Sequence, residues 1–166
     1  MRILGIDPGT RLVGVCILDV SERGEHLVIA ITIKLSARQP VNVRLACLDN
    51  QLTELIQQYQ PDELAIEDQY VGVNPRGCLK LAGSKHVAIL SATRAKMPVS
   101  EYAPCTVKKA VTGQGGADKS FVALCVYSML HVQQESFKYY DTTDAIAVAF
   151  CHAHQVQARK VLAAGG

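Results

Sequence analysis

The chain has 166 residues, of which 49% are hydrophobic, with six cysteines and a formal net charge of +2. This length predicts one globular domain over residues 1–166 with a substantial core, its last ~10 residues frayed. No run approaches the roughly 18 apolar residues of a membrane span and no secretory signal opens the chain, so we expect a soluble, cytoplasmic protein without a membrane partner. The sequence contains no Cys-x-x-Cys pair that would indicate a zinc site or a redox centre, so we expect reduced, mostly buried thiols.

Three β-type runs open the chain, and the turn residues between them predict an antiparallel meander. The runs are Met1–Asp7, Val13–Val20 and His26–Ile33. The period then changes, because apolar residues spaced by three or four predict an amphipathic helix over Val41–Tyr59. A short buried strand over Glu63–Glu67 follows.

The second half of the chain is predicted to be mostly helical. A helix over Leu79–Ala95, a strand over Val99–Tyr102 and a brief helix over Thr106–Val111 come first. A glycine-rich loop then leads into a helix from about Asp118, its expected N-cap, to His131, and the last helix is Asp141–His154. The order βββαβαβααα predicts an α/β fold, with a mixed five-stranded sheet and helices on both faces.

Four carboxylates lie far apart in the sequence, each where an apolar segment begins or ends. They are Asp7, Glu67, Asp141 and Asp144. If the fold brings them together, the cluster needs a divalent metal, because carboxylates a few ångströms apart cannot all stay ionised unaided. A two-metal site takes oxygen ligands from several segments, and Mg²⁺ or Mn²⁺ is the expected ion. The set therefore points to metal-assisted phosphoryl chemistry.

Each acid also has an ordinary structural interpretation. Asp7 belongs to Asp-Pro-Gly, a turn signature, and Glu67 stands at a strand exit, where acids are often only solvated. Asp141 and Asp144 suit the first turn of a helix through capping and the helix dipole. On that helix their spacing of three puts them on one face, about 5 to 6 Å apart at Cβ.

Basic residues gather in the middle of the chain. Between Arg76 and Lys119, eight basic and two acidic residues give six net positive charges, which leaves the remainder at −4. A basic region beside an acidic cluster suits a metal site that faces a phosphate backbone, although a solvated helix face is the alternative. His152 and His154 are interpreted as structural, because their spacing directs them to different faces of a helix.

Six ordered motifs resemble the RuvC family of Holliday-junction resolvases. They are Gly-Ile-Asp-Pro-Gly-Thr-Arg at 5–11, Leu-Ala-Ile-Glu at 64–67 with Tyr70 three beyond, Leu-Lys-Leu at 79–81, Val-Lys at 107–108, Gly-Gln-Gly-Gly-Ala-Asp-Lys-Ser at 113–120 and Asp-Thr-Thr-Asp-Ala-Ile-Ala at 141–147. Any one motif is weak. The ordered set, which runs from residue 1 to about 155, is specific.

The resemblance implies an RNase H-like fold and a structure-selective endodeoxyribonuclease. Such an enzyme works as a homodimer and resolves a four-way DNA junction by paired, symmetric nicks during recombination and repair. The four carboxylates would be its catalytic metal ligands, with two Mg²⁺ ions per active site, Mn²⁺ able to substitute, and products with 5′-phosphate and 3′-hydroxyl ends. A branch-migration motor complex is a further partner that the resemblance suggests.

The resemblance also bears on DNA contacts. Tyr70 holds the place of a family aromatic, usually Phe, that stacks on bases, and Lys108 and Lys119 match basic positions near the DNA backbone. An ordinary core aromatic and solvated surface lysines are the alternatives. The predicted DNA-binding set is Tyr70, Arg76, Lys80, Lys85, Lys108 and Lys119.

One segment departs from the family pattern. The chain reads Ala-Gly-Ser-Lys-His at 82–86, where the family usually reads Gly-Gln-Ala-Arg-Gly. Lys85 keeps the positive charge but loses the planar fork of arginine, and His86 replaces glycine with a bulkier side chain. The departure concerns how this helix meets DNA and leaves the four acids unchanged.

Rival interpretations come from other classes of protein. The start of the chain also resembles the first phosphate loop of actin-like and Hsp70-like ATPases, which need two large lobes. The segment 113–120 approaches a P-loop, but Asp118 stands where a glycine belongs and no clear buried strand precedes it. An RNase H-fold nuclease for structured RNA, similar to the YqgF group, and a junction-binding module without cleavage also stay open.

Overall fold

A five-stranded mixed sheet forms the centre of the computed structural model, which describes residues 1–68, 75–134 and 136–164, with side chains excluded at 75–81 and 164. The strands are β1 (Arg2–Asp7), β2 (Leu12–Ser21), β3 (Gly24–Lys34), β4 (Glu63–Glu67) and β5 (Val99–Tyr102). They lie in the order β3-β2-β1-β4-β5, with β1 antiparallel to β2 and parallel to β4. The predicted mixed five-stranded sheet is confirmed.

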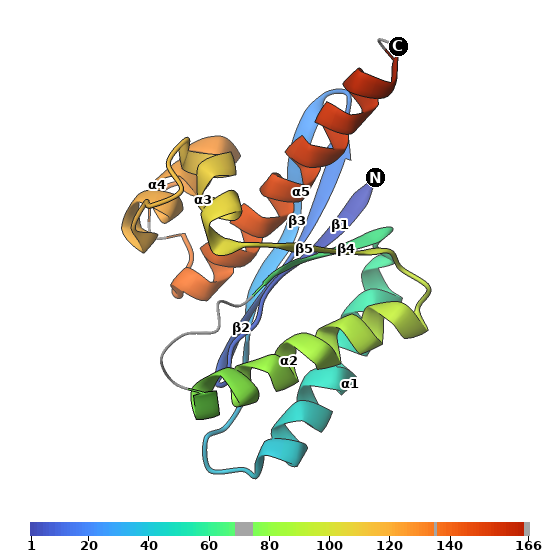
Figure 1. Ribbon diagram of the computed structural model, residues 1–166, viewed down its shortest axis with the longest axis vertical. Helices are drawn as coiled ribbons and strands as arrows, with labels where there is room; N and C mark the ends of the chain where they lie inside the picture. Colours follow the sequence, from blue (N-terminus) through green and yellow to red (C-terminus); the bar gives the residue numbers. More distant parts are fainter. Residues whose placement is uncertain (69–74, 135, 165–166) are drawn as a thin grey trace.

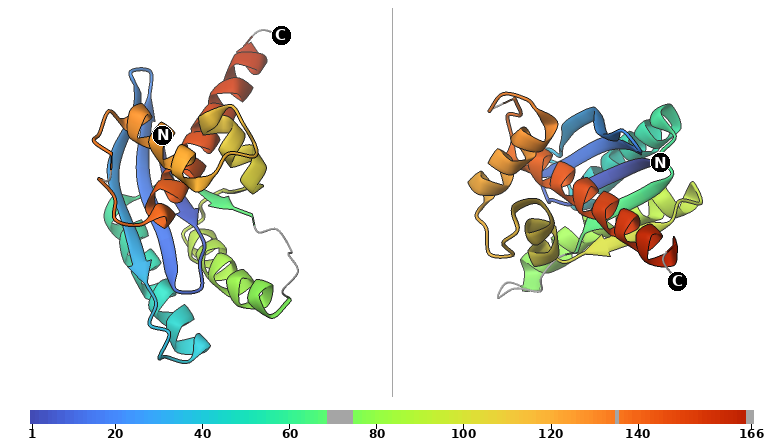
Figure 2. Two further views of the ribbon diagram at one scale, coloured as in Figure 1. Left: turned by 90° about the vertical axis from the view of Figure 1, so that its left-hand side faces the viewer. Right: turned by 90° about the horizontal axis from the view of Figure 1, so that it is seen from above.

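Helices cover both faces of this sheet, as predicted (Figure 1). They are α1 (Val41–Tyr59), α2 (Pro75–Arg94), α3 (Pro104–Thr112), α4 (Lys119–Leu130) and α5 (Tyr140–Ala164). The first two lie on one face, whereas α3, α4 and α5 lie on the other. Figure 2 shows α5 crossing the sheet diagonally, with its C-terminal end extending beyond the strands.

The alternation of side chains along the strands gives each face its own core. On the α5 side, Ile3, Cys16 and Leu18 pack against residues of α5 such as Ile146 and Phe150. On the other side, the intervening strand residues pack against α1 and α2. Because the strand side chains are buried on both faces, the residues between the charged first and last positions of β1 and β4 are all apolar.

Two helix boundaries differ from the sequence prediction by more than two residues. Helix α2 begins at Pro75, four residues before the predicted start, and proline suits the first turn of a helix because its fixed φ is already helical. Helix α5 continues to Ala164, ten residues beyond the predicted end at His154. No glycine or proline interrupts residues 155–164, so the segment expected to fray is helical through Ala164.

The thiols are less buried than the sequence predicts. Of the five cysteines described, Cys16 and Cys151 are buried, Cys125 is half-buried, and Cys47 and Cys105 are exposed. The two buried cysteines lie on β2 and α5, in the contact between helix and sheet, whereas the two exposed ones lie on α1 and α3. Within the described residues, no helix is both long and apolar enough to cross a membrane.

Candidate active site

Two of the four carboxylates leave the sheet side by side. Asp7 ends β1 and Glu67 ends β4, and these neighbouring strands are parallel, with Ile6 paired to Ile66. The residues that follow this pair therefore emerge at the same edge of the sheet. Because each acid ends a buried strand, both carboxylates lie at the carboxyl end of the parallel strands. Functional side chains commonly occur at this edge of a sheet.

The start of α5 brings the other two acids to the same edge because a glycine lets the helix approach. Gly14 on β2 is the cross-strand partner of Asp7, and a Cβ built on Gly14 would lie 1.7 Å from the carbonyl oxygen of Asp141. Only a residue without a side chain permits this approach. The first turn of α5 is also fixed by a 2.7 Å hydrogen bond between the hydroxyls of Thr32 and Thr142.

The pKa values show that the four acids act on one another. Burial first, and then the charges of Glu67, Asp144 and Asp141, raise the pKa of Asp7 to about 8. Burial and the charge of Asp144 raise the pKa of Glu67 to about 7. Burial also raises the pKa of Asp144, against the opposing effect of Lys119. A cluster of this kind cannot be fully ionised at neutral pH without added positive charge.

Lys119 supplies part of that positive charge. Its Nζ donates to Oδ2 of Asp144 at 2.7 Å, with the lysine side chain 62% exposed and the aspartate side chain 13% exposed. The lysine is the first residue of α4, which is capped as predicted by Asp118, whose Oδ1 accepts from the backbone N–H of Phe121 at 2.8 Å. The charge of Lys108 on α3 also lowers the pKa of Glu67 and of Asp144, partly offsetting burial.

The donor set fits a hard divalent cation. Carboxylate oxygens are the ligands that Mg²⁺ and Mn²⁺ prefer. The raised pKa values of Asp7 and Glu67 show that nearby positive charge does not balance the four carboxylates. In the part of the chain that the structure describes, no three His, Cys, Asp or Glu side chains already stand in coordinating positions. The carboxylates would therefore have to turn inward, and Asp144 would have to exchange Lys119 for the metal.

The remaining predicted DNA-binding residues fall into two groups. Lys85 is held by two carboxylates, Asp68 and Glu101, with its Nζ 2.5 Å from Oε2 of Glu101 and its side chain 13% exposed. A DNA contact by Lys85 would require these pairs to open. Tyr70 lies outside the described residues. The backbone of α2 includes Arg76 and Lys80, but their side chains lie outside what the structure describes.

The atypical segment at 82–86 packs against the turn that follows Asp7. Ser84 is buried and its hydroxyl donates to the carbonyl of Gly9 at 2.8 Å, which ties α2 to that turn. Gly83 faces Leu45 of α1, since an added Cβ would lie 3.3 Å from its side chain. His86 is exposed and its Nδ1 bonds to the carbonyl of Ala82 at 2.6 Å.

Sequence reasoning missed a group of side chains beside the start of α5. The ammonium of Lys34, at the end of β3, lies 5.1 Å from the ring centre of Tyr139, and that of Lys138 lies 5.7 Å from it. Tyr140 is 51% exposed. The sequence does contain a signal, because Phe-Lys-Tyr-Tyr at 137–140 interleaves aromatic and basic residues immediately before Asp141.

His152 has a structural role, as the sequence predicts. It is fully buried on α5, where its Nδ1 lies 2.7 Å from the hydroxyl of Tyr102 and its Nε2 lies 2.9 Å from Oε2 of Glu63. These bonds tie α5 to β5 and β4. The P-loop alternative also fails, because helix α3, and not a buried strand, precedes the loop at 113–118.

A mixed sheet whose neighbouring parallel strands end in acids, faced by two more acids on a helix, defines an RNase H-like nuclease fold. The family model for the crossover junction endodeoxyribonuclease RuvC matches residues 3–152. A RuvC from Salinibacter ruber is 39% identical over 93% of this chain and 86% of its own length. The chain therefore belongs to the RuvC family.

Solved structures agree with this assignment. The structure of Thermus thermophilus RuvC matches with a TM-score of 0.84 at 28% identity, covering 95% of this chain and 96% of that one. T. thermophilus RuvC in complex with Holliday junction substrate matches with the same TM-score of 0.84 at 25% identity and the same coverage. The family is one of metal-dependent nucleases, which agrees with the donor set described above.

Proposed function

We propose that this protein is a metal-dependent endodeoxyribonuclease that resolves Holliday junctions in recombination and repair. The observation that carries the proposal is the cluster of Asp7, Glu67, Asp141 and Asp144 at one edge of the sheet, in a chain of the RuvC family. A relative of the same fold is described in complex with Holliday junction substrate. This function accounts for both the acidic cluster and the lysines around it.

The four carboxylates would hold Mg²⁺, two ions per site, with Mn²⁺ as a substitute. When bound, such ions activate the attacking water and stabilise the leaving 3′ oxygen of an in-line displacement, which leaves 5′-phosphate and 3′-hydroxyl ends. Asp7 and Glu67 orient the ligand set because both are fixed at ends of paired strands. Lys119 would leave Asp144 for a DNA phosphate when the metal ions are bound, so the same side chain would balance charge in the metal-free protein and contact DNA in the complex.

DNA binding would use lysines on both sides of the cluster. Lys108 and Lys119 lie close enough to the acids to act on their charge, which suits contacts to the phosphates next to the cut. Tyr70 would stack on junction bases, and Arg76, Lys80 and Lys85 would hold an adjoining arm. Two symmetric cuts follow most simply from a homodimer, in which one two-fold axis relates two copies of the site. A branch-migration motor complex is a further proposed partner.

The test is cleavage of an end-labelled synthetic four-way DNA junction, beside a linear duplex of one arm and a structured RNA, with Mg²⁺ and with EDTA. We expect paired nicks, symmetric across the junction, in the Mg²⁺ lane alone. Nicking of the RNA instead would favour a nuclease for structured RNA. A stable junction complex that is never nicked in Mg²⁺ or Mn²⁺ would favour a binding module.

A further inference from the structure

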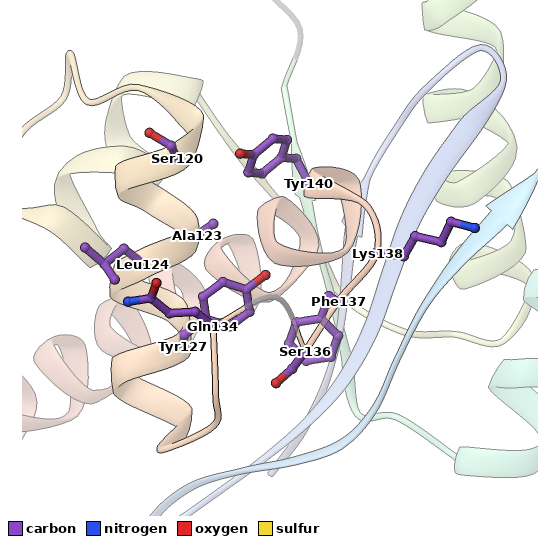
Figure 3. A pocket seen from close by; sticks show the side chains of 9 residues that line it. All are labelled: Ser120, Ala123, Leu124, Tyr127, Gln134, Ser136, Phe137, Lys138 and Tyr140. Carbon is purple, nitrogen blue, oxygen red and sulfur yellow. The ribbon is translucent and has the colours of Figure 1, made fainter.

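A pocket of about 690 Å³ opens beside the catalytic cluster, between α4 and the segment that leads into α5. Figure 3 shows Ser120 and Leu124 on the α4 side and Tyr140, at the start of α5, extending toward α4. Its floor includes Tyr127 and Phe137, whose rings stack with centres 6.0 Å apart and an interplanar angle of 12°. The size lies in the range of small-ligand sites.

Two connections place this pocket within one helical turn of the acids. Tyr140 and Asp144 are four residues apart on α5, so they share one face of that helix with Cβ atoms about 5 to 6 Å apart. Ser120 directly follows Lys119, whose ammonium lies 2.7 Å from Asp144. Successive nucleotides of a DNA strand are about 3.4 Å apart along the helix axis. A strand whose phosphate is at the acids can therefore reach the pocket with one or two neighbouring nucleotides.

The chemistry of the pocket suits a nucleotide base and its phosphate. Tyr140 is 51% exposed, and an exposed ring is a stacking surface for any base. Lys138 lines the pocket, and the ammonium of Lys34 lies 5.1 Å from the ring centre of Tyr139, the residue before Tyr140. The Tyr140 backbone is held in place, because its carbonyl accepts a 2.8 Å hydrogen bond from the hydroxyl of Thr143.

We propose that this pocket is a nucleotide subsite, in which Tyr140 stacks on an unpaired base of the junction strand next to the scissile phosphate while Lys138 and Lys34 contact the adjoining backbone. The inference rests on the proposed function and adds a residue that positions the strand for the cut. Junction strands near the crossover present bases that have lost a stacking neighbour, and the ring replaces that neighbour.

The chain has no tryptophan, so Tyr140→Trp gives a single fluorescent reporter at the pocket. The matched control is Leu162→Trp, at a position 22 residues further along α5, about 33 Å away, where the leucine is 79% exposed. Both are made in the Asp7→Asn background, so that junction is bound and not cut. We expect a saturable loss of tryptophan emission from the Tyr140→Trp variant on adding junction, with little change for the control.

Cleavage then tests whether one base is held. Single-turnover rates are measured at saturating protein for the parental chain, Tyr140→Phe and Tyr140→Ala. The substrates are an intact junction and four further junctions, each with a single abasic site at a different one of the four nucleotides that flank the cut. We expect Tyr140→Ala to slow cleavage roughly 5- to 150-fold, the range expected for loss of one stacked base, and Tyr140→Phe to retain the parental rate. At one position the abasic and alanine effects should not add.

The outcomes separate this inference from the function on which it rests. If the parental protein nicks no junction, the proposed function fails before any variant is compared. If the parental protein nicks the junction but the effects of Tyr140→Ala and the abasic site add at every position, Tyr140 holds no base and the inference is overturned. Unchanged tryptophan emission while the Tyr140→Trp variant binds junction would overturn it as well.

Discussion

At the scale of single residues, Lys119 supplies positive charge to the acid cluster of the metal-free protein. Its bond to Asp144 balances part of a cluster whose other members have raised pKa values. A side chain in this position is 62% exposed and is able to turn toward solvent or DNA. In the proposed function this side chain would leave Asp144 when metal ions occupy the site, which a motif match to a basic family position does not indicate.

Replacing Lys119 should change how junction binding depends on salt. Loss of one phosphate contact in Lys119→Ala is expected to lower the slope of log K against log salt concentration by roughly 0.9. Lys160→Ala, which removes an exposed lysine 16 residues beyond Asp144 on α5, is the matched control and should leave the slope unchanged. The slopes are measured by fluorescence anisotropy in Ca²⁺, which occupies the carboxylate site in place of Mg²⁺, on a junction that is not cut during the measurement. Equal slopes for both variants would place Lys119 off the phosphate path.

The raised pKa of Asp7 makes the stability of the metal-free protein depend on pH. Folding raises this pKa from 3.8 to about 8, so between these values the folded chain binds more protons than the unfolded chain. The free energy of unfolding must then fall as the pH rises from 5 to 8. Asp7→Asn removes the cost of ionising Asp7 and should stabilise the protein at pH 8 by about 1 kcal/mol or more.

Urea unfolding in EDTA at pH 5 and pH 8 measures this effect. The parental protein should lose stability between the two pH values, and the loss should be smaller in Asp7→Asn. Saturating Mg²⁺ should restore stability at pH 8 in the parental protein, since a ligand that binds only the folded state stabilises it. A parental protein that gains stability toward pH 8 in EDTA would contradict the described cluster.

At the scale of elements, the order of strands and helices could be predicted because each element has a clear period. The strands are apolar runs between turns, and α1 repeats its apolar residues every three or four positions. The ends of the helices are harder to predict than their order. In α5, nothing in the sequence distinguishes the last turn that packs on the core from the exposed extension to Ala164. The positions of Asp7 and Glu67 at strand ends could be predicted from sequence because each acid directly follows an apolar stretch.

Contacts between distant elements could not be predicted in the same way. The close approach of Gly14 to Asp141 and the bonds from His152 to Tyr102 and Glu63 join residues far apart in the chain. Periodicity describes one element at a time and carries no information on such pairs. The exposed thiols of Cys47 and Cys105 illustrate the same limit, since residue type alone favours burial.

Gly14→Ala tests how α5 is positioned. The added methyl would lie 1.7 Å from the Asp141 carbonyl oxygen and 2.5 Å from its carbonyl carbon, so the start of α5 must move. We expect a destabilisation of about 2 to 4 kcal/mol and loss of cleavage. Gly116→Ala, where an added Cβ meets nothing within 4 Å, is the control. Thermal unfolding and junction cleavage are compared for both, and parental behaviour of Gly14→Ala would refute the close approach.

At the scale of the whole molecule, the charges are arranged around the acid cluster. Lys108 lies on α3 and Lys119 on α4. Lys34, at the end of β3, and Lys138 lie near the ring of Tyr139, directly before α5. A strand that crosses the sheet edge would thus meet cations before and after the cut. This arrangement explains how a chain of net charge only +2 can bind a polyanion, since the distribution of charge matters more than its sum.

The proposed homodimer can be tested by mixing subunits. Dimers with one parental and one Asp7→Asn subunit should cut only one strand of a cruciform in a supercoiled plasmid. Open circles should then accumulate at the expense of linear product after the two proteins have been allowed to exchange subunits. Affinity tags on the two proteins show whether subunits have exchanged. If they have exchanged and the mixture still gives linear product without added open circles, one chain makes both cuts.

Whether the four carboxylates form the nuclease centre can be decided by a single comparison. Junction binding and single-turnover cleavage are measured for the parental protein and Asp7→Asn in the same Mg²⁺ buffer. We predict junction affinity within a few-fold of parental for the variant and a loss of cleavage of at least about 10³-fold, since removing a ligand charge disables the metal site. Cleavage by Asp7→Asn at the parental rate would show that the carboxylate cluster is not the nuclease centre.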